Sequence, residues 1–214
     1  MGPLPPDMNA TLDAYLDELV RWSTHLNLTS IGRAQMWARN VVEVQQLLGV
    51  AAPPLGCRVV DIGSGGGVPG IVIAVLRPDL SVTLIDSDRR KSAFLIHVAG
   101  LLGLPHVRVE AIRAEDAGRR GDLREQFDLA TSRATAPPPV LCELALPLLR
   151  VGGTLAALVA DAPAARHSCS GAASACGGSA PEAPAHGVLS VRKVALTPAR
   201  YPRRPGTPNR HPIS

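Results

Sequence analysis

A glycine-rich turn between two apolar runs constrains this chain more than any other feature. The β-rich run 58–62 contains Asp61 and leads into the turn, and a second apolar run of helical length follows it. That order predicts a strand, a tight loop and a helix, an arrangement that holds a nucleotide-like cofactor against a helix N-terminus. Glycines suit the loop because backbone without a Cβ turns sharply and lets a ligand approach closely. Those of the loop include Gly63, Gly65 and Gly67.

A carboxylate also marks the end of the next predicted strand. Twenty-five residues after Asp61, the β-rich run 82–85 is followed by Asp86. A carboxylate at the tip of the second strand of such a unit is placed to bind both hydroxyls of a ribose. Asp86 is therefore a candidate ribose ligand.

Two cofactor classes use this geometry, the nicotinamide or flavin dinucleotides and S-adenosylmethionine. Counted from Gly63, the dinucleotide pattern G-x-G-x-x-G fails because Val68 occupies the sixth position, although the register that starts at Gly65 and ends at Gly70 fits. The pattern alone leaves both classes open. Asp61 favours S-adenosylmethionine, because a negative charge there would repel a pyrophosphate and attract the ammonium and sulfonium groups of the methyl donor.

Composition narrows the class of protein. The 214 residues suffice for one α/β domain with a small appendage. No apolar run approaches the roughly 20 residues of a membrane span, and the start of the chain lacks the regions of a signal peptide. The four cysteines lack metal-ligand spacing. We therefore expect a cytoplasmic protein without a metal site or a membrane partner.

The positive charge is concentrated at the C-terminal end. The net charge is +4, but the residues before 187 carry 16 basic and 18 acidic side chains. A basic tail on a nearly neutral body indicates a polyanionic partner. Tyr201 beside Arg203 and Arg204 is suited to stack on a nucleic acid base while the arginines bind phosphates. The basic residues of the tail are Arg192, Lys193, Arg200, Arg203, Arg204 and Arg210.

The hydrophobic pattern divides the chain into four parts. Residues 1–50 predict a helical cap, with a first helix capped by Asn9 or Thr11. Residues 57–159 alternate between strands and helices, which predicts a mostly parallel sheet covered on both faces. The Ala/Ser/Gly/Pro-rich residues 160–187 predict a flexible loop, so that the sheet would be one strand short. Residues 188–214 predict an antiparallel edge strand and the basic tail.

Ligands of such sheets bind beyond the carboxyl ends of the strands. The third predicted strand is followed by Ala114 and Glu115, a backbone amide and a carboxylate that can read the exocyclic amine of adenine. The fourth is followed by Arg133, which would face the same cleft and touch the cofactor or a substrate phosphate. The candidate cofactor site is thus formed by residues that follow several different strands.

Together these stretches resemble the RsmG (GidB) family of 16S ribosomal RNA methyltransferases. The resemblance implies a Rossmann-like, class I S-adenosylmethionine-dependent methyltransferase fold with a small N-terminal helical cap. It also implies methylation of N7 of guanine 527 in 16S rRNA, with that RNA or the small ribosomal subunit as partner. We expect the protein to be a monomer. The stretches that carry it are 27–31, 37–39, 61–70, 86–95, 113–115, 132–134 and 201–206.

The resemblance also assigns roles to residues. It implies cofactor contacts from Gly63, Val68, Ala114, Glu115 and Arg133, with Asp86 at the ribose, and it places Tyr201, Arg203 and Arg204 on the RNA side. Asp61, Gly65 and Gly67 complete the expected cofactor site. Guanine N7 has no proton to lose, so no general base is expected, and Arg133 is the candidate for a catalytic role.

Three departures from the family pattern leave an alternative open. Asn40 stands where the family usually has histidine, and Val159 where it has lysine, while 160–187 replaces a helix and a strand. A non-catalytic RNA- or cofactor-binding relative therefore stays an alternative. A small-molecule methyltransferase or a dinucleotide enzyme is the third interpretation.

Overall fold

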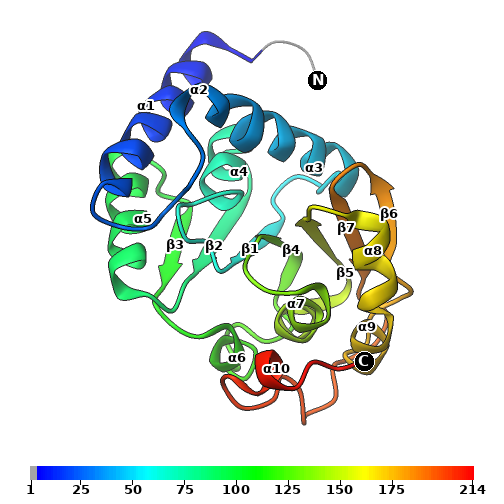
Figure 1. Cartoon of the computed structure of the whole chain (residues 1–214). Coiled ribbons are helices and arrows are strands. Elements are labelled where there is room, and N and C mark those ends of the chain that lie inside the picture. Colours follow the sequence, from blue (N-terminus) through cyan, green and yellow to red (C-terminus); the bar gives the residue numbers. More distant parts are fainter. Residues whose placement is uncertain (1–3) are drawn as a thin grey trace.

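Seven strands form one mixed sheet in the computed structural model, which describes residues 4–214 (Figure 1). Their order is β3-β2-β1-β4-β5-β7-β6. The first five strands run parallel, β7 is antiparallel to β5, and β6 is antiparallel to β7. The strands are β1 (Arg58–Ile62), β2 (Ser81–Ile85), β3 (Val107–Glu110), β4 (Phe127–Arg133), β5 (Leu149–Leu158), β6 (Glu182–Ala185) and β7 (Val188–Arg192).

The predicted α/β fold and parallel core are confirmed. The central strands are rich in β-branched residues and are buried along most of their length, as parallel strands covered on both faces require. The strand order reverses at β1, which lies between β2 and β4. That reversal opens a crevice at the carboxyl ends of these strands, the usual ligand position in such sheets.

Successive residues of one strand supply two separate cores. Val59 belongs to the core under the N-terminal helices, whereas Val60 belongs to the core on the other face. The first face carries α1 (Pro6–Ser23), α2 (Arg33–Met36), a π-helix (Trp37–Val42), α3 (Glu43–Ala51), α4 (Gly70–Leu76) and α5 (Arg89–Leu101). The second carries α6 (Ala114–Ala117), α7 (Pro138–Ala145), the 3₁₀ turn Leu146–Leu148, α8 (Ala162–Ser168), α9 (Ser170–Ala175) and α10 (Thr207–Arg210).

The helical cap packs as its periodicity predicts, but its first helix begins earlier. Leu12 and Leu16 are fully buried. The helix starts at Pro6, so the predicted N-cap residues Asn9 and Thr11 lie inside the helix. Proline favours this position because its missing N–H would be unsatisfied at a helix start in any case. The prediction of the N-cap was therefore wrong.

The expectation of a flexible loop at 160–187 is also wrong. This segment forms α8, α9 and β6, so the sheet is not one strand short, and β6 instead of β7 is the edge strand beyond β5. The side chain of Asp161 accepts a hydrogen bond from Ala164 N at 3.0 Å and caps α8. Alanine is a strong helix former, and its small side chain allows α9 to pack closely on α7. Ala165, Ala172 and Ala173 are buried there.

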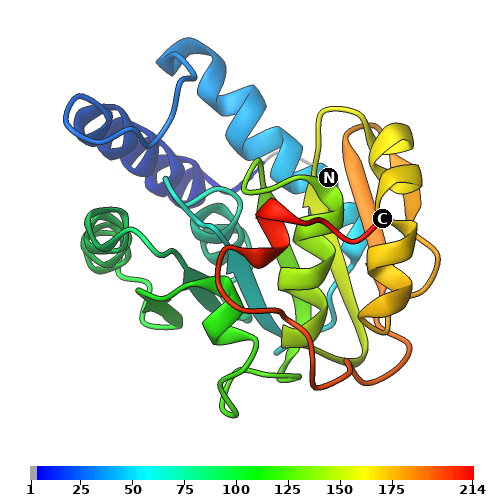
Figure 2. The same cartoon turned by 60° about the horizontal axis from the view of Figure 1, so that its bottom comes forward.

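The C-terminal tail folds back over α7 instead of extending into solvent (Figure 2). Lys193 is fully buried, and its Nζ donates to the carbonyl oxygen of Leu146 at 2.6 Å. Burial lowers the pKa of Lys193 to about 8. Arg124 holds the tail by donating to the carbonyl oxygens of Tyr201 at 2.9 Å and Thr197 at 2.7 Å. Lys193 is therefore not part of a basic surface.

Candidate active site

A cavity of about 1180 Å³ opens at the carboxyl edge of the sheet. Its floor includes the strand ends at Ile62, Ile85 and Leu158. Residues of the N-terminal cap form its opposite wall. A volume of this size exceeds what one small ligand needs, because typical ligand pockets measure roughly 300–1,000 Å³. The cavity can therefore hold a nucleoside cofactor together with part of a substrate.

The glycine loop lines the cavity with bare backbone. Gly63 and Gly65 have φ angles of +65° and +52°, which side chains other than glycine rarely adopt. A Cβ on Gly63 would lie 2.1 Å from Cγ2 of Thr135. Val68 also lines the cavity, whereas Gly67 faces Ile71 and Leu95 in the core. The loop is thus shaped to accept a ligand against its backbone.

Asp61 lies behind this loop and does not line the cavity. Its carboxylate accepts hydrogen bonds from Gly70 N at 3.2 Å and from Oγ1 of Thr131 at 3.0 Å. Burial raises the pKa of Asp61 to about 7. Asp61 therefore acts on the site by fixing the junction of the loop and α4, and direct contact with a cofactor finds no support in its position.

Asp86 lies in the cavity wall at the end of β2. Its Oδ2 accepts a hydrogen bond from Gly65 N at 2.8 Å, and its Oδ1 accepts one from Asp88 N at 2.8 Å. Each carboxylate oxygen has two lone pairs, so both keep accepting capacity for hydroxyl groups. This geometry suits the predicted role of Asp86 in binding the ribose, and the hydrogen bond from Gly65 connects Asp86 to the glycine loop.

Ala114 and Glu115 form the next part of the wall. The Glu115 side chain is 2% exposed, and its Oε1 accepts from Gly206 N at 2.9 Å and from Nη2 of Arg113 at 3.2 Å. Burial alone would raise the pKa of Glu115. These hydrogen bonds have the larger effect, so the pKa lies below its usual value. Glu115 is therefore ionised, and Oε1 is already committed to the tail and to Arg113.

Arg133 reaches from the end of β4 to the cap. Its Nη1 donates to Oδ1 of Asn40 at 2.7 Å and to the carbonyl oxygen of Arg39 at 3.0 Å. Burial lowers the pKa of Arg133. Asn40 is fully buried in the π-helix, and its Nδ2 has no hydrogen-bond partner in residues 4–214. Arg133 lines the cavity and also holds the cap in place, so a positioning role follows directly from its contacts.

Several residues that line the cavity come from distant segments and were not predicted from the sequence. Glu43 of the cap lines it and pairs with Arg39 at 3.0 Å. His186 lies in the turn between β6 and β7, beside Val159, whose N–H donates to the carbonyl oxygen of Gly187 at 2.9 Å. Asn209 of α10 lines it as well. Only the long-range packing of the chain reveals these positions.

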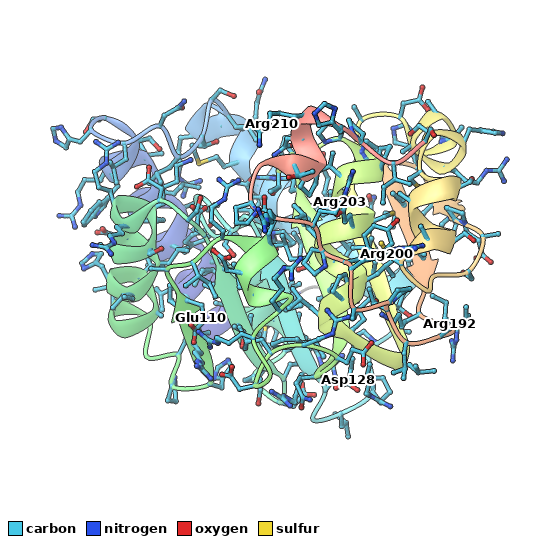
Figure 3. The ribbon with its side chains drawn as sticks, turned by 90° about the horizontal axis from the view of Figure 1, so that it is seen from below. Glu110, Asp128, Arg192, Arg200, Arg203 and Arg210 are labelled. Atoms are coloured by element: carbon cyan, nitrogen blue, oxygen red, sulfur yellow. The ribbon has the colours of Figure 1, made fainter. Side chains whose placement is uncertain are left out.

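The three predicted RNA-binding residues differ in exposure, and only Arg204 is exposed. Arg203 pairs with the buried Glu143, with Nη2 at 2.6 Å from Oε2, and so fastens the tail to α7. Tyr201 is half-buried, and the guanidinium of Arg200 lies 5.1 Å from its ring centre. Arg204 is exposed, as are Arg200 and Arg210. Figure 3 shows Arg200, Arg203 and Arg210 along the tail and Arg192 apart from Arg210.

Comparisons with known proteins show the family to which this chain belongs. The family model GidB, described as rRNA small subunit methyltransferase G, matches residues 8–180. Ribosomal RNA small subunit methyltransferase G of Chloroflexus aggregans is 38% identical over 99% of this chain and 92% of the relative. The protein of the same name from Moorella thermoacetica is 34% identical over 98% of this chain and 92% of the relative.

Solved structures show the same fold at low identity. A mutant of MtNAS in complex with S-adenosylmethionine superposes with a TM-score of 0.58 at 12% identity, covering 87% of this chain and 76% of that chain. A protein from Corynebacterium glutamicum superposes with a TM-score of 0.56 at 18% identity, covering 85% and 90%. These likenesses concern the arrangement of helices and strands alone.

Proposed function

This chain belongs to the rRNA small subunit methyltransferase G family, and from that premise we propose that it transfers a methyl group from S-adenosylmethionine to N7 of guanine 527 in 16S ribosomal RNA. We further propose that it acts as a monomer in the cytoplasm, on the small ribosomal subunit or its RNA. The observation that carries the proposal is the cavity at the carboxyl edge of the sheet, bordered by the glycine loop and Asp86. A non-catalytic relative is not favoured, because the relatives that match nearly the whole chain are named as methyltransferases.

The residues present fit the methyl donor. The positive φ angles of Gly63 and Gly65 leave a backbone cradle that a Cβ would disturb. Asp86 suits the ribose hydroxyls, and Ala114 lies where an adenine base would be read. When bound, S-adenosylmethionine supplies an activated methyl group. The chain's own task is to hold and orient that donor.

The proposed reaction needs no acid or base from the protein. The lone pair of guanine N7 forms the new bond to the methyl carbon, and the electron pair of the breaking carbon–sulfur bond stays on sulfur. No proton leaves N7, so rate enhancement comes from alignment of the two reactants and exclusion of water. The cavity supports both effects, because cap residues such as Leu28 and Ile31 line it together with the strand ends. Arg133 contributes by fixing the cap through Asn40.

The exposed arginines of the tail are proposed to bind RNA phosphates. Gln in place of both Arg204 and Arg210 is expected to weaken RNA binding and to reduce the slope of log affinity against log salt by about 1–2. Filter binding to 16S rRNA fragments at several salt concentrations measures this change. Arg192→Gln is the control, since Arg192 ends β7 opposite Thr154 and so lies far from the carboxyl ends of the parallel strands. An equal loss in the control would contradict a tail-specific RNA surface.

Nucleoside analysis tests the proposed reaction. The full chain is incubated with labelled S-adenosylmethionine and small ribosomal subunits that lack the modification, and the RNA is digested and separated. We expect label in 7-methylguanosine, at no more than one methyl group per 16S rRNA. Donor binding without any methylated nucleoside would instead identify a non-catalytic relative. Label in another nucleoside would refute the assignment of N7.

A further inference from the structure

The C-terminal helix α10 reaches the cofactor cavity from the far end of the sequence. Asn209 lines this cavity together with Ala114 and Glu115. Figure 1 shows α10 beside α6, the helix that begins with Ala114, and α10 also packs on α7. The tail therefore forms part of the wall where an adenine base is expected.

Contacts with α6 seat the tail at this position. Gly206, directly before α10, donates its N–H to Oε1 of Glu115 at 2.9 Å. A side chain is excluded at Gly118, where a Cβ would lie 2.9 Å from Cγ of Pro202. The guanidinium of Arg119 also donates to the carbonyl oxygen of Pro202. The segment before α10 is thus held at three points.

The segment after α10 is held as well. Arg203 Nη2 donates both to Oε2 of Glu143 at 2.6 Å and to the carbonyl oxygen of His211 at 2.8 Å. His211 directly follows α10, so one guanidinium links α7 to the end of this helix. Asn209 is exposed, but these contacts on both sides of α10 give it a defined position.

The carboxamide of Asn209 complements the edge of adenine. That edge presents an exocyclic amine, which donates, beside a ring nitrogen, which accepts, and an asparagine side chain offers the matching acceptor and donor. Glu115 can match only half of this edge: its Oε1 already accepts from Gly206 and Arg113, and although Oε2 can accept from the amine, an ionised carboxylate has no donor for the ring nitrogen. Ala114 offers only backbone groups.

We propose that the C-terminal segment 201–210 completes the donor site and that Asn209 recognises the adenine base. This inference rests on the proposed function and deepens it. It assigns the tail a role in donor binding that does not require RNA. The exposed Arg204 and Arg210, which are proposed to bind RNA, lie in the same segment, so the proposed RNA-binding surface adjoins the donor site.

Calorimetry without RNA tests the proposal. The full chain is titrated with S-adenosylhomocysteine and with S-inosylhomocysteine, in which the exocyclic amine is replaced by a carbonyl oxygen. The unmodified chain is expected to prefer the adenine compound. Asn209→Ala is expected to lose roughly tenfold in affinity for it, as the loss of one or two hydrogen bonds predicts, and to lose most of the preference.

His211→Ala is the matched control, because His211 follows α10 and its side chain does not line the cavity. It should bind both compounds like the unmodified chain. Equal binding of the adenine compound by Asn209→Ala and the unmodified chain would overturn this inference and leave the proposed function intact. An unmodified chain that binds neither compound would overturn both. Circular dichroism of each variant verifies that the fold is retained.

Discussion

Replacing Gly63 with alanine is expected to lower the affinity for S-adenosylmethionine at least tenfold and to remove most methyl transfer. Gly63 has a φ of +65°, and its new Cβ would meet Cγ2 and Oγ1 of Thr135 at 2.1 and 2.4 Å. Oγ1 of Thr135 donates to the carbonyl oxygen of Ile62 at 2.9 Å, so Thr135 is not free to move away. The loop must shift instead, and the donor cradle shifts with it. Donor titration and single-turnover methylation measure the two losses.

Gly56→Ala separates this effect from backbone strain. Gly56 has a φ of +72°, similar to that of Gly63, but a Cβ there meets no atom within 4 Å. Both substitutions introduce about 1–2 kcal/mol of strain from the left-handed conformation. Only the Gly63 variant should lose donor binding. Donor affinity in Gly63→Ala within twofold of the Gly56 control would refute the role assigned to the loop.

Replacing Arg203 with alanine is expected to destabilise the protein by about 3 kcal/mol, because it leaves the charge of Glu143 buried without its partner. The Glu143 side chain is 1% exposed, and that of Arg203 is 28% exposed. The loss should lie at the low end for a buried pair, since the backbone N–H of Arg203 still donates to Glu143 at 2.8 Å. The free energy of unfolding in urea measures the effect.

Arg33→Ala provides the comparison with a surface pair. Arg33 contacts Asp13 and Asp17, which are 54% and 70% exposed, so its loss should cost no more than about 1 kcal/mol. An Arg203 variant as stable as the Arg33 variant, but defective in RNA binding, would show that Arg203 faces RNA. Such a result would contradict the structural role assigned to Arg203.

The sequence predicted those elements that local patterns determine. The strand at 58–62 has the predicted bounds, and the strand at 81–85 contains the predicted run 82–85, because Val and Ile runs flanked by turns are strong local signals. The prediction for 160–187 was wrong because an alanine-rich composition fits both a flexible loop and packed helices. Only burial against α7 decides between them.

In the candidate site, too, residues that follow a local pattern were predicted and residues brought in by long-range packing were not. Gly63, Asp86 and Glu115 line the cavity as their places after strand ends predict. His186 and Asn209 line it too, but they arrive through folding of distant segments and carry no local motif. The partner of Arg203 was hidden for the same reason, because Glu143 is sixty positions away in the chain.

The most direct test of this account is a calorimetric titration of the full chain with S-adenosylmethionine and, separately, with NADH. We expect S-adenosylmethionine to saturate one site per chain, S-adenosylhomocysteine to compete for it, and NADH to produce no binding heat. Saturation by NADH, with no response to either sulfur nucleoside, would contradict the assignment of the cavity to a methyl donor.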